Sequence, residues 1–172
     1  MINMAKEPVD LTKIKIPEHP LEMLQTPQDR ADNLPVLIAL YETILDTVEE
    51  NLRIKGKRLE AANVEHATWL AYYDQRKIEL STITKFMLAQ VESARGKLWK
   101  DYTKNMSLDL NYRDKENFIN NEPYYLAMHE LYLEIEELYK KFDAVVEAFK
   151  SRGYALNNIT RIRIAEMSDY VL

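Results

Sequence analysis

Four basic residues and a tryptophan lie close together near the middle of the chain: Arg95, Lys97, Trp99, Lys100 and Lys104. Only Asp101 adds a negative charge within this segment. On a helix, which turns about 100° per residue, the three lysines project within about 60° of one another. Lysines on one helix face can follow a phosphate backbone, and a neighbouring indole can stack on an unpaired base. The segment therefore predicts a nucleic-acid site, although a solvated surface whose lysine stems cover apolar neighbours would give the same pattern.

Arg95 and Lys97 point in different directions from a single helix. They can serve one DNA path only if helices from several subunits lie side by side. Linked copies of a weak site also add their affinities. The site is therefore expected to work in a homo-oligomer.

Residues that could catalyse a reaction or hold a metal ion are sparse. The histidines, His19, His66 and His129, lie far apart in the sequence. None has the spacing of a di-iron bundle or of a two-histidine zinc helix. The absence of cysteine excludes disulfides and thiolate metal sites. We therefore expect a protein that is not an enzyme and uses no metal or cofactor, with His66 and His129 packed in the core.

The overall charge and hydropathy narrow the class of protein. The chain has 172 residues and a net charge of −5, which argues against a protein that is basic all over but leaves room for a local basic site. The longest apolar run, residues 34–41, is too short to span a bilayer. The N-terminus lacks the apolar core of a signal peptide. These features predict a soluble intracellular protein.

The predicted fold is all-α, with long helices that form an extended hairpin or bundle. The chain has 3 glycines, and five of its 6 prolines fall within the first 35 residues. Residues 1–34 are expected to form a proline-containing arm, which is either partly disordered or a strap that packs on a neighbouring subunit or partner. A helix is predicted to start near Asn33 or Pro35, which suit cap and first-turn positions. Gly56 ends or bends that helix.

Two longer helices are expected beyond that glycine. The first covers about residues 58–105, the second begins at Pro123, and polar residues 105–122 form a loop or a break between them. Apolar residues in both recur three or four positions apart, as in a heptad pattern. The stripe of the second helix comprises Tyr125, Met128, Tyr132, Ile135, Tyr139, Phe142, Val146 and Phe149. Flanking apolar residues make this face broad enough to contact more than one helix.

The second long helix is predicted to stop at Gly153, because a glycine in the left-handed conformation often ends a helix. Lys150 and Arg152 would then complement the negative end of the helix dipole. The stop divides the chain into a helical core over residues 35–152, which carries the basic segment, and a C-terminal assembly segment over residues 153–172.

A short final helix is predicted from about Asn158 to Asp169. Its apolar residues face two ways, so one hairpin cannot cover them, and we expect it to pack against a second subunit. The residues assigned to oligomerisation are Tyr154, Leu156, Ile159, Ile162, Ile164 and Met167.

Three segments carry a resemblance to a known family. The first is residues 149–156 (Phe-Lys-Ser-Arg-Gly-Tyr-Ala-Leu) with the closing helix. The second is residues 69–70 (Trp-Leu) with the lysine-rich helix that follows, and the third is residues 95–98 (Arg-Gly-Lys-Leu). Together they resemble the UvsY-type recombination mediator proteins of T-even-like phages. The resemblance covers roughly residues 58–168.

The resemblance implies a recombination mediator. Such proteins form ring-like homo-oligomers, here about six or seven subunits, which bind single-stranded DNA in the cytoplasm of the infected bacterial host. They help to load a RecA-like recombinase onto DNA covered by single-stranded-DNA-binding protein. Arg95 and Lys97 would contact DNA, and the C-terminal helix would assemble the ring. Gly96 is a departure within this basic motif, because a glycine weakens a helix by roughly 1 kcal/mol, and a local kink there would change the geometry of DNA binding.

A second class of function fits the same sequence. The acidic net charge and the tyrosine-rich stripes suit a helical scaffold or adaptor that assembles through its heptad faces and binds only protein partners.

Overall fold

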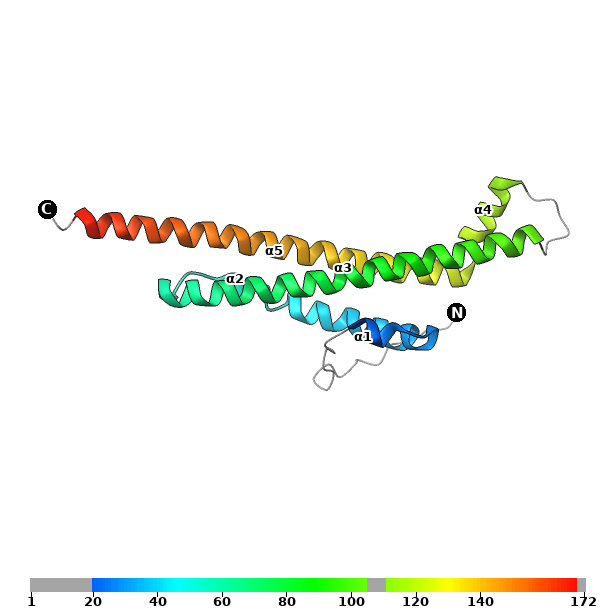
Figure 1. Cartoon of the computed structure of the whole chain (residues 1–172), viewed down its shortest axis with the longest axis horizontal. Helices are drawn as coiled ribbons and strands as arrows, with labels where there is room; N and C mark the ends of the chain where they lie inside the picture. Colours follow the sequence, from blue (N-terminus) through cyan, green and yellow to red (C-terminus); the bar gives the residue numbers. More distant parts are fainter. Residues whose placement is uncertain (1–19, 105–110, 170–172) are drawn as a thin grey trace.

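Two long antiparallel helices dominate the chain in a computed structural model that describes residues 20–104 and 111–169 (Figure 1). They are α3 (Leu59–Lys104) and α5 (Pro123–Asp169), and they form an extended hairpin. Three shorter pieces precede α3: the 3-10 helix η2 (Pro20–Leu24), α1 (Pro27–Leu45) and α2 (Val48–Leu52). The described residues contain no strand, so the predicted all-α hairpin is confirmed.

The hairpin is held by the apolar stripes of its two long helices. The buried residues of α3 are Ala62, Tyr73, Leu80, Ile83, Met87, Val91 and Ala94. The buried apolar residues of α5 are Ile135, Leu138, Phe142, Val146, Phe149 and Leu156. Tyr73 packs its ring against Phe149 and Phe142, with centroid distances of 5.0 and 6.3 Å. The three-and-four spacing thus placed the facing sides of both helices correctly.

The helix predicted before Gly56 is α1, and it starts earlier than predicted. Thr26 caps α1, because its hydroxyl accepts from the Asp29 backbone N–H at 3.1 Å and Asp29 accepts from the Thr26 backbone N–H at 3.0 Å. Pro27 follows at the first helical position, where a proline costs no hydrogen bond. This reciprocal cap starts the helix ahead of Asn33, and Pro35 therefore lies inside α1. The predicted start at Asn33 or Pro35 is wrong.

Part of the predicted N-terminal arm belongs to the core of its own chain. Leu24 and Leu34 are fully buried, and both join the cluster formed by α1, α3 and α5. Residues 20–34 are therefore neither a disordered arm nor a strap for another subunit, and the boundary predicted after residue 34 falls inside α1. Residues 1–19 lie outside the described residues.

The predicted helix stop at Gly153 is also wrong. The α5 helix continues without interruption to Asp169, so the separate helix from Asn158 and the domain boundary at Gly153 do not exist in the structure. Among the described glycines, only Gly56 has a positive φ, at 86°, and it turns the chain between α2 and α3 as predicted. Gly153 serves a close approach instead, because a Cβ there would lie 2.7 Å from His66 Nε2.

The break between the long helices contains a helix of its own. Residues 105–110 lie outside the described residues, and α4 (Tyr112–Asn120) then crosses the end of the hairpin (Figure 1). The Asn111 side chain caps α4 by accepting from the Asp114 backbone N–H at 3.0 Å. Its Ile119 is fully buried. Pro123 begins α5 as predicted.

Candidate nucleic-acid interface

The α4 end of the hairpin brings aromatic residues of two helices together. The rings of Trp99 on α3 and Tyr112 on α4 lie 5.1 Å apart, centroid to centroid. One turn further along, Tyr102 and Phe118 make a second ring contact at 5.9 Å. These contacts, with buried Ile119, fix α4 against the last turns of α3. Tyr112 nevertheless stays 64% exposed.

An open cleft of about 370 Å³ lies beside the Trp99–Tyr112 pair. Its lining residues are Glu92, Arg95, Gly96, Trp99 and Tyr112. Gly96 lies inside α3, which is continuous from Leu59 to Lys104. A Cβ at Gly96 would meet nothing within 4 Å. The glycine therefore leaves the wall of the cleft bare.

Arg95 lies at the rim of this cleft and is paired. Its Nη2 donates to Glu116 Oε1 on α4 at 2.7 Å, and the Tyr112 hydroxyl donates to the same oxygen at 3.1 Å. The Arg95 and Glu116 side chains are 46% and 32% exposed. A solvated pair of this kind is worth about 0–1 kcal/mol, so a phosphate can compete for the guanidinium.

The three lysines lie on a different side of α3. Lys97, Lys100 and Lys104 are exposed, and within the described part of the chain no carboxylate forms an ion pair with them. Arg95 and Lys97 are two residues apart, which turns their side chains about 200° from each other. The structure therefore unites Arg95 with Trp99 in the cleft, while the lysines form a separate row.

Two residues that α4 brings against this end of α3 were not anticipated from the sequence, and Glu92 of α3 was not anticipated as a cleft residue. Tyr112 and Glu116 fall in the segment expected to be a loop or a break. The spacing of Asn111 and Asp114, a good N-cap followed by an acid in the first turn, was a usable signal for a helix start there. That signal competed with the many polar residues around it.

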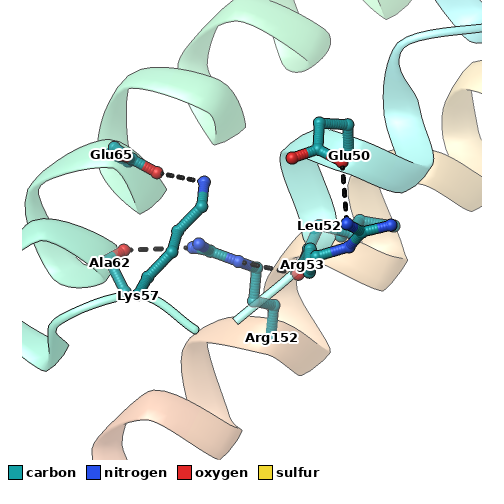
Figure 2. Close-up of polar contacts among 7 residues, drawn as sticks. All are labelled: Glu50, Leu52, Arg53, Lys57, Ala62, Glu65 and Arg152. Carbon is teal, nitrogen blue, oxygen red and sulfur yellow. Dashed lines mark hydrogen bonds and ion pairs between the residues drawn. The ribbon is translucent and has the colours of Figure 1, made fainter. Parts of the chain in front are cut away.

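Arg152, at the other end of the hairpin, is structural rather than a basic surface site (Figure 2). It comes from α5 and is only 5% exposed. Its Nε donates to the carbonyl of Leu52 at 3.1 Å, and its Nη1 donates to the carbonyl of Ala62 at 3.2 Å. Burial lowers the pKa of Arg152, and the nearby Glu65 carboxylate opposes that shift. The predicted role of Arg152 in a helix-end dipole is wrong, because α5 does not end there.

His66 lies beside this arginine. Its ring stacks on Phe149 at 6.5 Å and lies directly over Gly153. Burial, followed by the charge of Arg152, lowers the pKa of His66, and its Nδ1 is buried without a hydrogen-bond partner. His66 is thus partly buried at the core edge, close to its predicted place. His129 is also partly buried, between Tyr125 and Tyr132 at 5.9 and 6.1 Å.

The predicted oligomerisation residues differ in their accessibility. Leu156 is fully buried within its own chain, so its assignment to a subunit interface is wrong. Tyr154, Ile162 and Ile164 are 73%, 58% and 60% exposed, and Ile159 is half-buried. The side chain of Met167 lies outside the described part of the chain. The C-terminal end of α5 projects beyond the start of α3 (Figure 1). Tyr154 is exposed for another reason, because its neighbours Gly153 and Leu156 still pack within the chain.

Residues 20–104 and 111–169 contain no group of three or more histidine or acidic side chains arranged to hold a metal ion. None of the helices described is long and apolar enough to cross a bilayer.

Comparison of the chain with protein-family models, with curated proteins and with solved structures gives no significant match.

Proposed function

We propose that this protein is a recombination mediator that binds single-stranded DNA. It would help to load a RecA-like recombinase onto DNA covered by single-stranded-DNA-binding protein, in the cytoplasm of an infected bacterial host. The observation that carries the proposal is the arrangement at the α4 end of the hairpin. Among the described residues, a row of lysines without ion-pair partners lies there on one side of α3, and an exposed aromatic cleft with an arginine at its rim lies on another side.

The mechanism is binding and remodelling, with no bond made or broken. Lys97, Lys100 and Lys104 would neutralise successive phosphates and release counterions, which makes affinity fall steeply with salt. Arg95 would exchange Glu116 for a phosphate. Arg95 and Lys97 point in different directions from one helix, so both can contact one DNA strand only when several copies of the protein lie side by side. The proposal therefore includes a ring-like homo-oligomer.

The projecting end of α5 supports assembly of such an oligomer. Tyr154 and Ile162 on α5 are 73% and 58% exposed and offer apolar area to a second copy. Burying such area against a second copy is favourable by roughly 25 cal/mol per Å². Arg161 and Arg163 are also exposed there and would add positive charge to the assembled surface.

The test removes Arg95 and Lys97, the proposed DNA contacts, in one double variant. It compares this variant with a second one that lacks two other lysines. In Arg95→Ala with Lys97→Ala, we expect affinity for labelled oligo-dT to fall by about tenfold or more at ~0.1 M salt. The control is Lys140→Ala with Lys141→Ala, which makes the same charge change on exposed lysines paired to Glu136 and Glu137. Light scattering should give both variants the mass of the parent.

Equal affinities in the two double variants would reject the DNA site. A parent protein that does not bind oligo-dT at low or moderate salt would reject the whole proposal.

A scaffold that binds only protein is the second candidate. Exposed apolar side chains on the outer faces of the hairpin favour it: Val64, Ile78, Leu126 and Leu133. The α4 end also carries Glu92, Asp101 and Asp114 beside its cations. The same oligo-dT titration separates the two functions, because a pure scaffold gives no salt-dependent binding.

A further inference from the structure

We infer that the cleft beside Trp99 and Tyr112 takes one unpaired nucleobase that carries an exocyclic amino group, such as cytosine. This inference rests on the proposed binding of single-stranded DNA and adds a base preference to it. The volume of about 370 Å³ lies at the lower end of the 300–1,000 Å³ typical of small-ligand sites. The cleft is therefore large enough to receive a single base.

The aromatic pair supplies the stacking surface. Its centroid distance of 5.1 Å means that the two rings already touch, so a base cannot slide between them. Tyr112 is 64% exposed, and the base would lie on the open side of the pair that faces the cleft. Stacking of this kind is sequence-tolerant by itself, because every base has a π-face.

Gly96 gives the base room to approach. It lies one turn before Trp99 on the same wall, and a Cβ there would meet no atom within 4 Å. Even the smallest side chain at this position would therefore project into otherwise empty space. A glycine within a helix costs roughly 1 kcal/mol relative to alanine, and no packing contact among the described residues requires a glycine at position 96.

Glu92 is the residue that makes the cleft selective. It lines the cleft, is exposed, and has no ion-pair partner among the described residues. An anionic carboxylate repels phosphate but accepts a hydrogen bond from an amino group, as Glu and Asp do from cytosine N4. A thymine or uracil presents a carbonyl oxygen at that position and would meet the carboxylate as an acceptor facing an acceptor.

The same helix also carries the cation, one turn after Glu92. Arg95 reaches the cleft from the next turn of α3 and is held by Glu116 across the α3–α4 junction. A nucleotide whose base lies in the cleft can place its own phosphate near this guanidinium. The cleft thus presents an acceptor for the base and a donor for the backbone, which matches a nucleotide better than an apolar peptide side chain.

The experiment compares oligo-dC with oligo-dU of the same length, because these bases differ at position 4 and not in ring size. The protein carries Trp69→Phe, so Trp99 is the remaining tryptophan and reports on the cleft. We expect oligo-dC to bind at least about threefold more tightly and to quench Trp99 more strongly. Glu92→Gln should bring the two affinities together, since an amide can also donate to a carbonyl.

Substitutions at Tyr112 test the stacking surface separately. Tyr112→Leu should weaken binding of both oligonucleotides by roughly fivefold or more. Tyr112→Phe keeps the ring and should bind more tightly than Tyr112→Leu. Tyr112 also packs on Trp99 and donates to Glu116, so circular dichroism must show the parent's helix content in both variants before their affinities are compared.

Equal affinity for oligo-dC and oligo-dU in the parent, with Tyr112→Leu unchanged, would overturn this inference. If the Arg95 and Lys97 substitutions still weakened binding in that case, the proposed function would stand without the base site. Failure to bind either oligonucleotide would remove both.

Discussion

The two ends of the hairpin use arginine in opposite ways. Arg152 is 5% exposed and binds two backbone carbonyls, from Leu52 and Ala62. Arg95 is 46% exposed at its side chain and binds one carboxylate, Glu116, at the surface. Both residues belong to short basic segments that also contain a glycine. Because Arg152 is buried, its hydrogen bonds stabilise the fold. Because Arg95 is exposed, its guanidinium remains accessible.

The glycines next to these arginines differ in the same way. Gly153 is covered by the His66 ring at 2.7 Å from an ideal Cβ, and Gly96 faces open space. Each lies inside a continuous helix, so neither is a helix stop. The contrast separates a glycine required by packing from one that packing does not require.

Removing the buried arginine should have the largest effect on stability. Arg152→Met leaves the carbonyls of Leu52 and Ala62 without this donor, and we expect it to lower the free energy of unfolding by about 3 kcal/mol. Lys150→Met is the control, because Lys150 is exposed and only pairs with Glu147, so its loss should cost at most about 0.5 kcal/mol. Urea unfolding followed by circular dichroism measures both. Equal losses in the free energy of unfolding would show that the hydrogen bonds of Arg152 do not stabilise the fold.

The two glycines form a matched pair for the next effect. Gly96→Ala should raise the free energy of unfolding by about 1 kcal/mol through helix propensity. Gly153→Ala gains the same propensity but clashes with His66, and overpacking costs about 1–3 kcal/mol, so we expect a net loss. Thermal unfolding of the two variants gives the difference in sign.

A double variant identifies the cause of that loss. In a His66→Ala background, Gly153→Ala should become stabilising, because the ring that it would strike is gone. If Gly153→Ala destabilises equally in both backgrounds, the close approach is not the reason for the glycine.

Local patterns in the sequence were enough to place the long helices, while contacts between distant residues were not. The stripes around Tyr73 and Phe149 follow from helical spacing alone. Gly153 was misread because its partner His66 lies on another helix, and Arg152 because the carbonyl of Leu52 is 100 positions away. The residues next to a glycine in the sequence do not show whether it ends a helix or leaves room for an aromatic ring from another helix.

The candidate site divides along the same line. Arg95, Trp99 and the lysines were found from their types and spacing, because a helix displays them directly. Tyr112 and Glu116 come to the cleft only through the packing of α4 on α3. The sequence therefore indicated the chemistry of the site, and the fold supplied the other wall of the cleft.

The pH dependence of stability should show the smallest effect, and it also comes from the Arg152 end. Burial and the charge of Arg152 hold the pKa of His66 below its usual value of 6.5. Between that lowered pKa and 6.5 the unfolded chain binds a proton that the folded chain does not, so the free energy of unfolding falls as the pH falls below about 6.5.

We expect the parent protein to lose more stability between pH 7.5 and 5.5 than the His66→Phe variant. The carboxylates with lowered pKa, such as Asp29 and Glu137, act at lower pH and are present in both proteins. Parallel urea-unfolding curves across this window would show that His66 is not held neutral beside Arg152.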